Sequence, residues 1–249
     1  MKKGTIRNLL VTSILACTAA VSQAAVESWD YEINMSWDTS ATIFYGVGKE
    51  INNPTYIGWG YGTSEPRYHP SYLSITKSKA SGNIKVGEPV SVNEYVQFTH
   101  YNGVSDAYDR GLKIAVLNVS VQLTLPGTTD VIATLSSEPF KLHYLGGAEC
   151  SSVFGVDPSG INFKQTFDYG GMSYEVNFYE AFQFKPLDER HCINLQLGKS
   201  CVGFITAPRT TSSASFRISI TAVPEPETYA MMLAGLALVG AVARRRKGR

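Results

Sequence analysis

The middle of the chain alternates between apolar and polar positions with a period of two. From Ser28 to Trp37 every second residue is aromatic or aliphatic, and the residues between them are polar. Successive side chains of a β-strand point to opposite faces, so this pattern predicts a strand with one buried face and one face in water. The same alternation recurs in three shorter stretches, 90–98, 140–144 and 216–220.

Two further stretches predict strands with special features. Residues 112–125 change their apolar parity near the middle, which indicates either a strand covered on both faces or a bulge. Stretches 161–169 and 172–178 flank Gly170-Gly171, and two glycines tolerate the positive φ of a two-residue turn. These two stretches therefore predict a β-hairpin.

Helical periodicity is weak between the two ends of the chain. No stretch there gives three clean turns of period 3.6, and there is no internal repeat or heptad. Clusters of Gly, Pro and Ser predict loops, among them 79–89, 146–160 and 210–215. We predict an all-β fold over residues 25–222, a single antiparallel β-sandwich, jelly-roll-like, with about ten strands.

The first 24 residues have the three parts of a secretory signal peptide. Two lysines precede an apolar stretch, and small residues stand at Ser22 and Ala24. This arrangement predicts export, with cleavage by signal peptidase between Ala24 and Ala25. A lipoprotein signal around Cys17 is the alternative, and it fits less well because the A-x-A-like site lies further along the chain.

The chain ends in a second three-part segment, residues 223–249. Pro224-Glu225-Pro226 is followed by an apolar run over 229–243 and then by a basic cluster over 244–249. A helix of about 15 residues rises roughly 22 Å, which is short for a hydrocarbon core of about 30 Å. The basic cluster favours a membrane position because it would stay cytoplasmic. We therefore predict one transmembrane helix at about 229–243, rather than a buried helix that ends the domain.

This ending resembles the PEP-CTERM sorting signal of Gram-negative bacteria, with Pro224, Glu225 and Pro226 as its motif and Arg244, Arg245 and Arg246 as its transmembrane stop. The resemblance implies a precursor held transiently in the inner membrane, recognition by an exosortase, and release or attachment at the cell surface. Tails of this type are also described as the C-terminal domain of ice-binding proteins. That description concerns the tail and is no evidence of ice binding.

The charge of the chain is distributed unevenly. The formal net charge is +1, yet residues 25–223 alone hold 14 basic and 19 acidic residues, a balance of −5. An acidic domain repels a phosphate backbone, so we expect no nucleic-acid partner. An apolar share of 44 % excludes a disordered chain.

Three cysteines follow the signal peptide, at positions 150, 192 and 201. An exported chain meets an oxidising compartment, so the close pair Cys192 and Cys201 is predicted to form a disulfide. Cys150 is then a buried free thiol, an intermolecular link, or the true partner of one of the other two. Zinc ligation by the cysteines with His191 is a weaker alternative, because no C-x-x-C or H-x-x-x-H spacing occurs.

Other candidate chemistry is sparse in this sequence. The four histidines lie in separate segments, and no G-x-S-x-G, H-E-x-x-H, P-loop or EF-hand spacing occurs. Asp106 with Asp109, or Asp157 with Asp168, are candidate calcium ligands, with surface solvation as the default interpretation. We therefore predict no catalytic residue, no metal site and no cofactor.

One short motif ends an alternating strand and precedes a glycine. It consists of Thr99, His100 and Asn102. Together with the tail, it resembles the THxN family of PEP-CTERM proteins, and the likeness extends to residues 57–60, 73–75 and 192–206. The family has no established biochemical activity, so the resemblance implies a class and no reaction. Thr and Asn side chains can bond backbone groups at a turn and a histidine can bridge two loops, which favours a structural role for the motif.

These features predict a non-enzymatic protein that is exported through the inner membrane, delivered to the cell surface and associated with the exopolysaccharide or biofilm matrix. The alternative is a carbohydrate-binding module that uses Tyr56, Trp59, Tyr61 and Tyr68 around a loop, although core packing explains most aromatic residues more simply. A secreted hydrolase is less favoured, and it would require two carboxylates that face one cleft.

Overall fold

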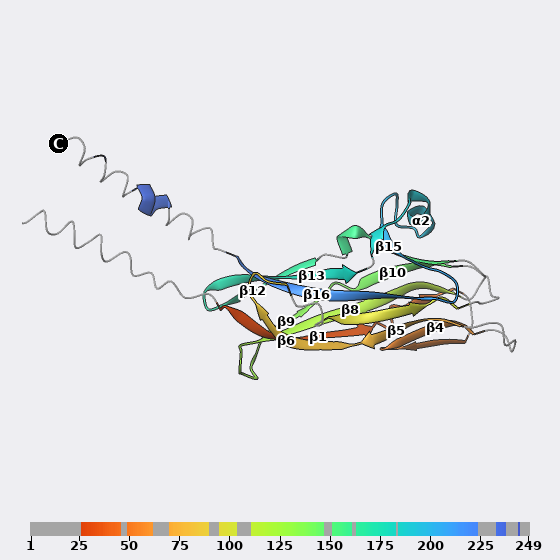
Figure 1. The fold of residues 1–249 in the computed structure, drawn as a ribbon, viewed down its shortest axis with the longest axis horizontal. Helices are drawn as coiled ribbons and strands as arrows, with labels where there is room; N and C mark the ends of the chain where they lie inside the picture. The colour runs from red at the N-terminus through yellow and green to blue at the C-terminus, as the bar shows by residue number, and fades with distance from the viewer. Residues whose placement is uncertain are drawn as a thin grey trace, which may run out of the picture.

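The protein is a sandwich of two antiparallel β-sheets. The computed structural model describes residues 26–45, 49–61, 70–89, 95–103, 111–146, 151–160, 163–182, 184–223, 233–237 and 244. Within these ranges, sixteen strands form a nine-stranded and a seven-stranded sheet, which face each other across one core (Figure 1). The all-β sandwich is confirmed, and the number of strands is larger than the predicted ten.

The first sheet, called the β8 sheet, has the order β14-β15-β11-β10-β8-β1-β6, and β2 and β9 also pair with β8. Its strands are β1 Ser28–Trp37, β2 Ile43–Phe44, β6 Lys79–Lys85, β8 Leu112–Thr124, β9 Val131–Ser136, β10 Phe140–Leu145, β11 Ser152–Val156, β14 Lys185–Pro186 and β15 Val202–Thr206.

The second sheet, called the β16 sheet, has the order β12-β13-β16-β7-β5-β4-β3. Its strands are β3 Lys49–Asn53, β4 Tyr56–Tyr61, β5 Ser71–Lys77, β7 Val96–Tyr101, β12 Phe163–Tyr169, β13 Met172–Phe182 and β16 Thr211–Val223. The sandwich domain also contains the 3-10 turn η1, Pro158–Gly160, and the helix α2, Glu189–Asn194.

The period of two in β1 places its side chains as predicted. All five apolar residues of the strand are buried and the polar residues between them are partly exposed. Trp29 meets the rings of Phe167, Tyr169 and Tyr174 edge to face, with centroids 5.2–5.4 Å apart. Because those rings belong to the β16 sheet, these contacts join the two layers at one end of the core.

The parity change in β8 comes from a bulge, because the consecutive residues Ile43 and Phe44 of β2 pair with Ile114 and Leu112 and leave one extra residue in β8. β1 pairs with residues 117–124 of β8, whereas β2 pairs with Leu112 and Ile114 and the register shifts between those two residues. Val116, at the change of partner, is buried and accepts a backbone bond from Asp38. The strand is therefore both bulged near one end and covered at the point where its parity changes.

The predicted hairpin around Gly170-Gly171 is confirmed. β12 and β13 pair from Tyr169 with Met172 onward, and the two glycines have φ of 60° and 75°. Both values lie in the left-handed region that a type I′ turn requires, where a Cβ atom is unfavourable.

Three stretches predicted as loops contain strands instead. β6 occupies most of 79–89, β11 lies within 146–160, and β16 already begins at Thr211. β6 is an edge strand with only Ala80 and Ile84 buried, so its sequence is mostly polar. All five residues of β11 are buried, because this strand lies between β10 and β15 under α2, so no alternation marks it.

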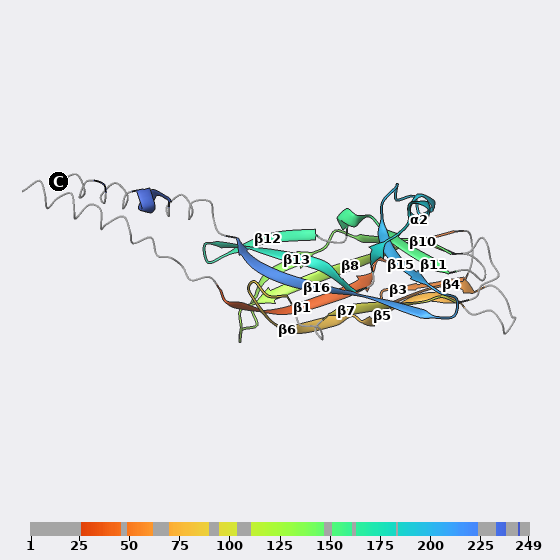
Figure 2. The ribbon, with the colours of Figure 1, turned by 45° about the horizontal axis from the view of Figure 1, so that its top comes forward.

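The two ends of the sandwich domain lie together. The backbone N–H of Val26 donates to the Tyr174 hydroxyl at 2.8 Å, and Tyr174 pairs with Ala222 near the end of β16. Figures 1 and 2 show β1 beginning and β16 ending at one end of the elongated molecule, with β4 and β5 toward the other. The first 25 residues and the tail are thus joined to the same end.

The predicted transmembrane helix is not confirmed by the structure. Of residues 229–243 the structure describes 233–237, which are helical and exposed. Among the described residues, no helix combines the length and the apolar character that a membrane span needs. The predicted signal peptide, residues 1–24, lies outside the described residues.

Candidate functional site

His100 lies inside the sandwich, in a box of aromatic rings. It follows Val96 and Phe98 on the inward face of β7, and its side chain is 0 % exposed. The ring of Trp59 lies parallel to that of His100 with centroids 5.8 Å apart, and Phe154 meets it edge to face at 4.7 Å. Tyr144 and Phe204 complete the box. A substrate therefore has no access to His100 in this fold.

A chain of buried hydrogen bonds connects His100 with the opposite sheet. His100 Nδ1 and the Thr206 hydroxyl are 2.9 Å apart, and the Asn102 amide donates to the Thr206 carbonyl oxygen at 2.9 Å. The Ser152 hydroxyl donates to Asn102 Oδ1 at 2.7 Å and lies 3.2 Å from the Tyr144 hydroxyl. This His100 network joins β7 with β10, β11 and β15 across the sandwich.

Asn102 also fixes the turn by which the chain crosses from one sheet to the other. Its backbone N–H donates to Thr210, and its carbonyl oxygen accepts from Arg209 at 2.7 Å. Arg209 has a φ of 57°, a backbone conformation that is uncommon for a residue other than glycine. The backbone and side chain of Asn102 therefore hold both ends of the β15–β16 crossover.

Thr99 lies on the other face of β7, away from the network. Its hydroxyl is 3.0 Å from that of Ser213 on β16, directly across the strand pair. The three motif residues are thus not brought together at one site, because Thr99 faces outward while His100 and Asn102 face the core.

Burial determines the charge state of the network. It lowers the pKa of His100 to about 3 and raises the pKa of the Tyr144 hydroxyl, because a charged form loses its solvation in the core. Both side chains are therefore neutral at physiological pH. A neutral histidine can bond the Thr206 hydroxyl through Nδ1, and a neutral phenol can bond the Ser152 hydroxyl, which suits a structural network.

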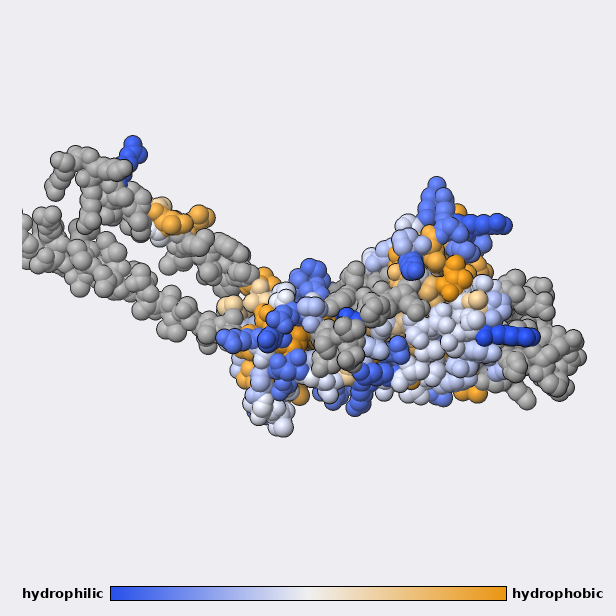
Figure 3. Space-filling model, viewed as in Figure 1, coloured by the Kyte–Doolittle hydropathy of each residue, from blue (hydrophilic) through white to orange (hydrophobic). Residues whose placement is uncertain are grey.

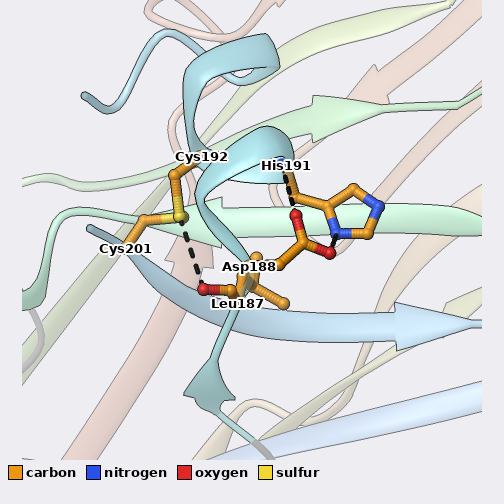
Figure 4. A network of polar contacts seen from close by, with 5 residues as sticks. All are labelled: Leu187, Asp188, His191, Cys192 and Cys201. Carbon is orange, nitrogen blue, oxygen red and sulfur yellow. Dashed lines mark hydrogen bonds and ion pairs between the residues drawn. A yellow bond between two sulfur atoms is a disulfide. The ribbon is translucent and has the colours of Figure 1, made fainter. Parts of the chain in front are cut away.

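The disulfide predicted between Cys192 and Cys201 is present, with the two Cα atoms 5.5 Å apart. It ties α2 to the start of β15, and Cys192 Sγ lies 3.9 Å from the carbonyl oxygen of Leu187 (Figure 4). Asp188 is the N-cap of α2, accepting from the His191 backbone N–H at 2.8 Å and pairing with the His191 ring. The disulfide and the cap together fix this short helix on the β8 sheet.

The disulfide excludes two of the alternatives for the cysteines, zinc ligation by Cys192 and Cys201 and the pairing of either one with Cys150. Both sulfurs are joined to each other, so they are not zinc ligands, and Cys150 is the partner of neither. The His191 ring pairs with Asp188, the N-cap of the same helix. Cys150 itself lies outside the described residues. In the described ranges, no group of three or more His, Cys, Asp or Glu side chains is placed to hold a metal ion.

Two paired glycines permit close contacts on the β8 sheet, Gly155 with the end of α2 and Gly203 with the backbone of β11. Gly155 and Gly203 lie opposite each other on β11 and β15. A Cβ atom on Gly155 would lie 2.6 Å from Leu195, and one on Gly203 would overlap the Phe154 carbonyl oxygen. Next to this contact, Ile193 and Ile205 are exposed, and apolar side chains gather at the base of α2 (Figure 3).

The carboxylates of the candidate calcium sites are used within their own turns. Asp157 accepts from the backbone N–H and the hydroxyl of Ser159, and Asp168 accepts from the hydroxyl of Ser173. Asp106 and Asp109 lie outside the described residues. Asp157 and Asp168 therefore each have a local hydrogen-bond partner.

A hollow of about 450 Å³ beside α2 brings Glu138, Asp157 and His143 to one surface. Hydrogen bonds from Ser159 lower the pKa of Asp157, which is the opposite of what a catalytic acid needs. His143 Nδ1 is 3.0 Å from the Leu195 carbonyl oxygen, and burial lowers the pKa of this histidine. These contacts favour a structural role for both groups.

The four aromatic residues of the carbohydrate-binding alternative do not form one surface. Trp59 is only 2 % exposed and faces the core, whereas Tyr56 lies on the outward face of β4. The side chain of Tyr61 and the whole of Tyr68 lie outside the described part.

The comparisons with known proteins concern the end of the chain. Residues 222–247 match the PEP-CTERM protein-sorting motif. The chain therefore carries a PEP-CTERM sorting motif. This motif indicates a protein that is exported, anchored in the membrane as a precursor and sorted by an exosortase. No curated protein matches the chain.

The PEP-CTERM motif begins within the last strand, since β16 ends at Val223. Pro224, Glu225 and Pro226 lie outside the described residues, as do Arg245, Arg246 and the predicted cleavage site at Ala24 and Ala25. Arg244 is described and is exposed. No spacer of irregular residues separates the sandwich from the matched region.

Sequence reasoning missed Ser152, Thr206 and Tyr144 of the His100 network and Phe154 of the aromatic box. Their positions along the chain give no sign of contact with His100, because they come from strands 44 or more residues away. The segments that carry the THxN resemblance do include three residues that contact or pair with His100. Trp59 stacks on His100, Leu73 pairs with it across the strands, and Thr206 bonds it.

Proposed function

We propose that the protein is a non-enzymatic component of the extracellular matrix, of the THxN type, that associates with exopolysaccharide after an exosortase has removed its tail. The single observation that carries this proposal is the sorting motif over residues 222–247, which delivers the sandwich to the outside of the cell. The His100 network supports the non-enzymatic part, because the motif residue with catalytic potential is enclosed by rings and hydrogen-bonded within the core.

The mature protein tests this proposal directly. Cells that produce the full chain are separated into inner membrane, extracellular matrix and medium, and the protein in each is characterised by mass spectrometry. We expect a chain that begins near Ala25, ends near Pro226 and is enriched in the matrix, from which enzymatic digestion of the polysaccharide releases it. A periplasmic protein of the same cells is the control for leakage. A full-length chain confined to the inner membrane would contradict the proposal.

A carbohydrate-binding module is the second candidate, and one observation favours it. Tyr56, Tyr72 and Tyr101 form a row on the outward face of the β16 sheet, with adjacent rings stacked. This surface replaces the loop cluster predicted from the sequence, since Trp59 is buried.

A further inference from the structure

Three tyrosines on neighbouring strands form a continuous row on the outer face of the β16 sheet. Tyr72 lies directly opposite Tyr101, and Tyr56 lies diagonally from Tyr72. Ring centroids are 5.3 Å apart in both pairs, with planes inclined by 26° and 24°. All three side chains are half-buried, and the residues that alternate with them face the core. We call them the tyrosine row.

A second row lies beside the first, displaced from it by two residues on β5 and β7. It continues onto β16, and Tyr56 on β4 lies opposite its first member, Ser74. Ser74 pairs with Thr99, and Thr99 pairs with Ser213, so their side chains share the outer face with the tyrosine row. The Thr99 and Ser213 hydroxyls are 3.0 Å apart. We call these three residues the hydroxyl row. The motif threonine thus belongs to a surface, unlike His100 and Asn102.

The two rows offer complementary contacts for a sugar polymer. The tyrosine rings stack on one another, so their outer edges form an apolar strip against which the C–H groups of a sugar chain can pack. Hydroxyl groups both donate to and accept from sugar hydroxyls. Neither row contains a charged residue, and the exported domain carries a balance of −5, so an uncharged polymer fits better than an acidic one.

We propose that this face of the β16 sheet binds a neutral, extended polysaccharide, with sugar rings against the tyrosine row and sugar hydroxyls at the hydroxyl row. This inference deepens the proposed function and rests on it for the source of the ligand. The rows lie toward the end of the sandwich away from Val26 and Val223 (Figure 2). The binding face is therefore presented away from the anchored tail.

A purely structural role for the tyrosine row is the competing explanation. Cross-strand aromatic pairs stabilise sheets, and Gly58, which pairs with Tyr72, leaves space that the rings can cover. The two roles predict different results, because a structural row changes the stability of the fold while a binding row changes affinity in a protein that is still folded.

The test is affinity electrophoresis of the full chain in nonionic detergent, through gels that contain hydroxyethyl cellulose, mixed-linkage β-glucan or alginate. We expect both neutral polymers to retard the protein and alginate to leave it unretarded. Tyr72→Ala should weaken retardation about tenfold. Tyr72→Phe should keep most of it, because the ring stack remains. Tyr45→Ala is the matched control, since Tyr45 is exposed next to β2 of the other sheet.

Each outcome supports or overturns the inference. If Tyr72→Ala does not fold, Tyr56→Ala at the end of the row takes its place, with thermal unfolding measured for every variant. The inference is overturned if no neutral polymer retards the native chain, if only alginate does, or if folded Tyr72→Ala and Tyr56→Ala are retarded like the native chain. Because the gels do not depend on sorting, matrix association without retardation contradicts this inference alone. Retardation of a chain that cells leave unprocessed contradicts only the proposed function.

Discussion

His100 shows how a residue with catalytic potential is used to hold a core. Its ring fills a box of four aromatic side chains, and Nδ1 bonds Thr206 on the opposite sheet. Burial keeps the ring neutral, so its Nδ1 can serve as one partner of a neutral hydroxyl. Protonation in the core would place an unpaired charge there.

The lowered pKa of His100 predicts a loss of stability in acid. The ring has a pKa of about 3 in the folded chain, against an ordinary 6.5, so the unfolded state binds more protons between these values. Stability should therefore fall as the pH falls from 6.5 toward 3, by up to about 1.4 kcal/mol per pH unit for this group. Chemical denaturation of the native chain and of His100→Gln at several pH values measures the difference. Equal slopes for the two proteins would show that His100 does not titrate as described.

Asn102 and Thr99 should differ in their effect on stability, although both belong to the motif. Asn102→Ala leaves the Thr206 carbonyl and the Ser152 hydroxyl without their buried partner, so we expect a loss of about 3 kcal/mol. Thr99→Ala removes a half-buried bond at the surface, and the expected loss is about 1 kcal/mol or less. Urea unfolding compares the two variants. A larger loss for Thr99→Ala would contradict the assignment of Asn102 as the structural residue.

At the scale of elements, the sequence predicts the strands that have one wet face. β1 and the β12–β13 hairpin follow from alternation and from two adjacent glycines. β6 and β11 do not, because the first is a polar edge strand and the second is buried along its whole length. Local periodicity does not specify the order of strands in each sheet either, since that order depends on which buried faces pack together.

The His100 network was beyond prediction for a related reason. Its hydrogen bonds join residues separated by 104 and 106 positions, and nothing in the local pattern of either strand specifies the partner. The disulfide could be predicted, because compartment and close spacing limit the possible partners of each cysteine.

The disulfide should stabilise the α2 element in the exported protein. It closes a loop with a sequence separation of 9, for which the chain-entropy model gives about 2.5–3 kcal/mol. The double variant Cys192→Ser with Cys201→Ser should lose roughly this amount, while Cys150→Ser leaves the bond intact. Peptide mapping after alkylation without reduction identifies the bond. Recovery of both cysteines as alkylated thiols from native protein would contradict the pairing.

At the scale of the molecule, the sandwich has a membrane-proximal end and a distal end. Val26 and Val223 lie together, and β16 carries the chain from the His100 network to that end over roughly 35 Å. Because β16 ends at Val223 and the matched region begins at residue 222, the folded domain reaches into the sorting motif. An enzyme that acts on the tail needs an accessible, extended segment at this junction.

The final prediction concerns that junction. Prolines at 224 and 226 cannot lie inside a continuing helix, so they should keep the backbone around Glu225 extended and open to the exosortase. Replacing both with alanine should let the tail helix extend toward the sandwich and enclose Glu225 without preventing insertion into the membrane. The variant is then expected to accumulate in the inner membrane with a mass that corresponds to residues 25–249, while the native chain loses about residues 227–249.

Pro126→Ala is the matched control for this experiment, because Pro126 lies in an exposed turn between β8 and β9 and is remote from the tail in sequence. It should be processed like the native chain. Processing of the double variant at the native rate would mean that recognition depends on hydrophobicity and the arginine cluster and not on an extended segment. Native surface protein that retains Arg244 to Arg249 would mean that the tail is a permanent anchor, because the basic cluster is cytoplasmic and survives only if no cleavage precedes it.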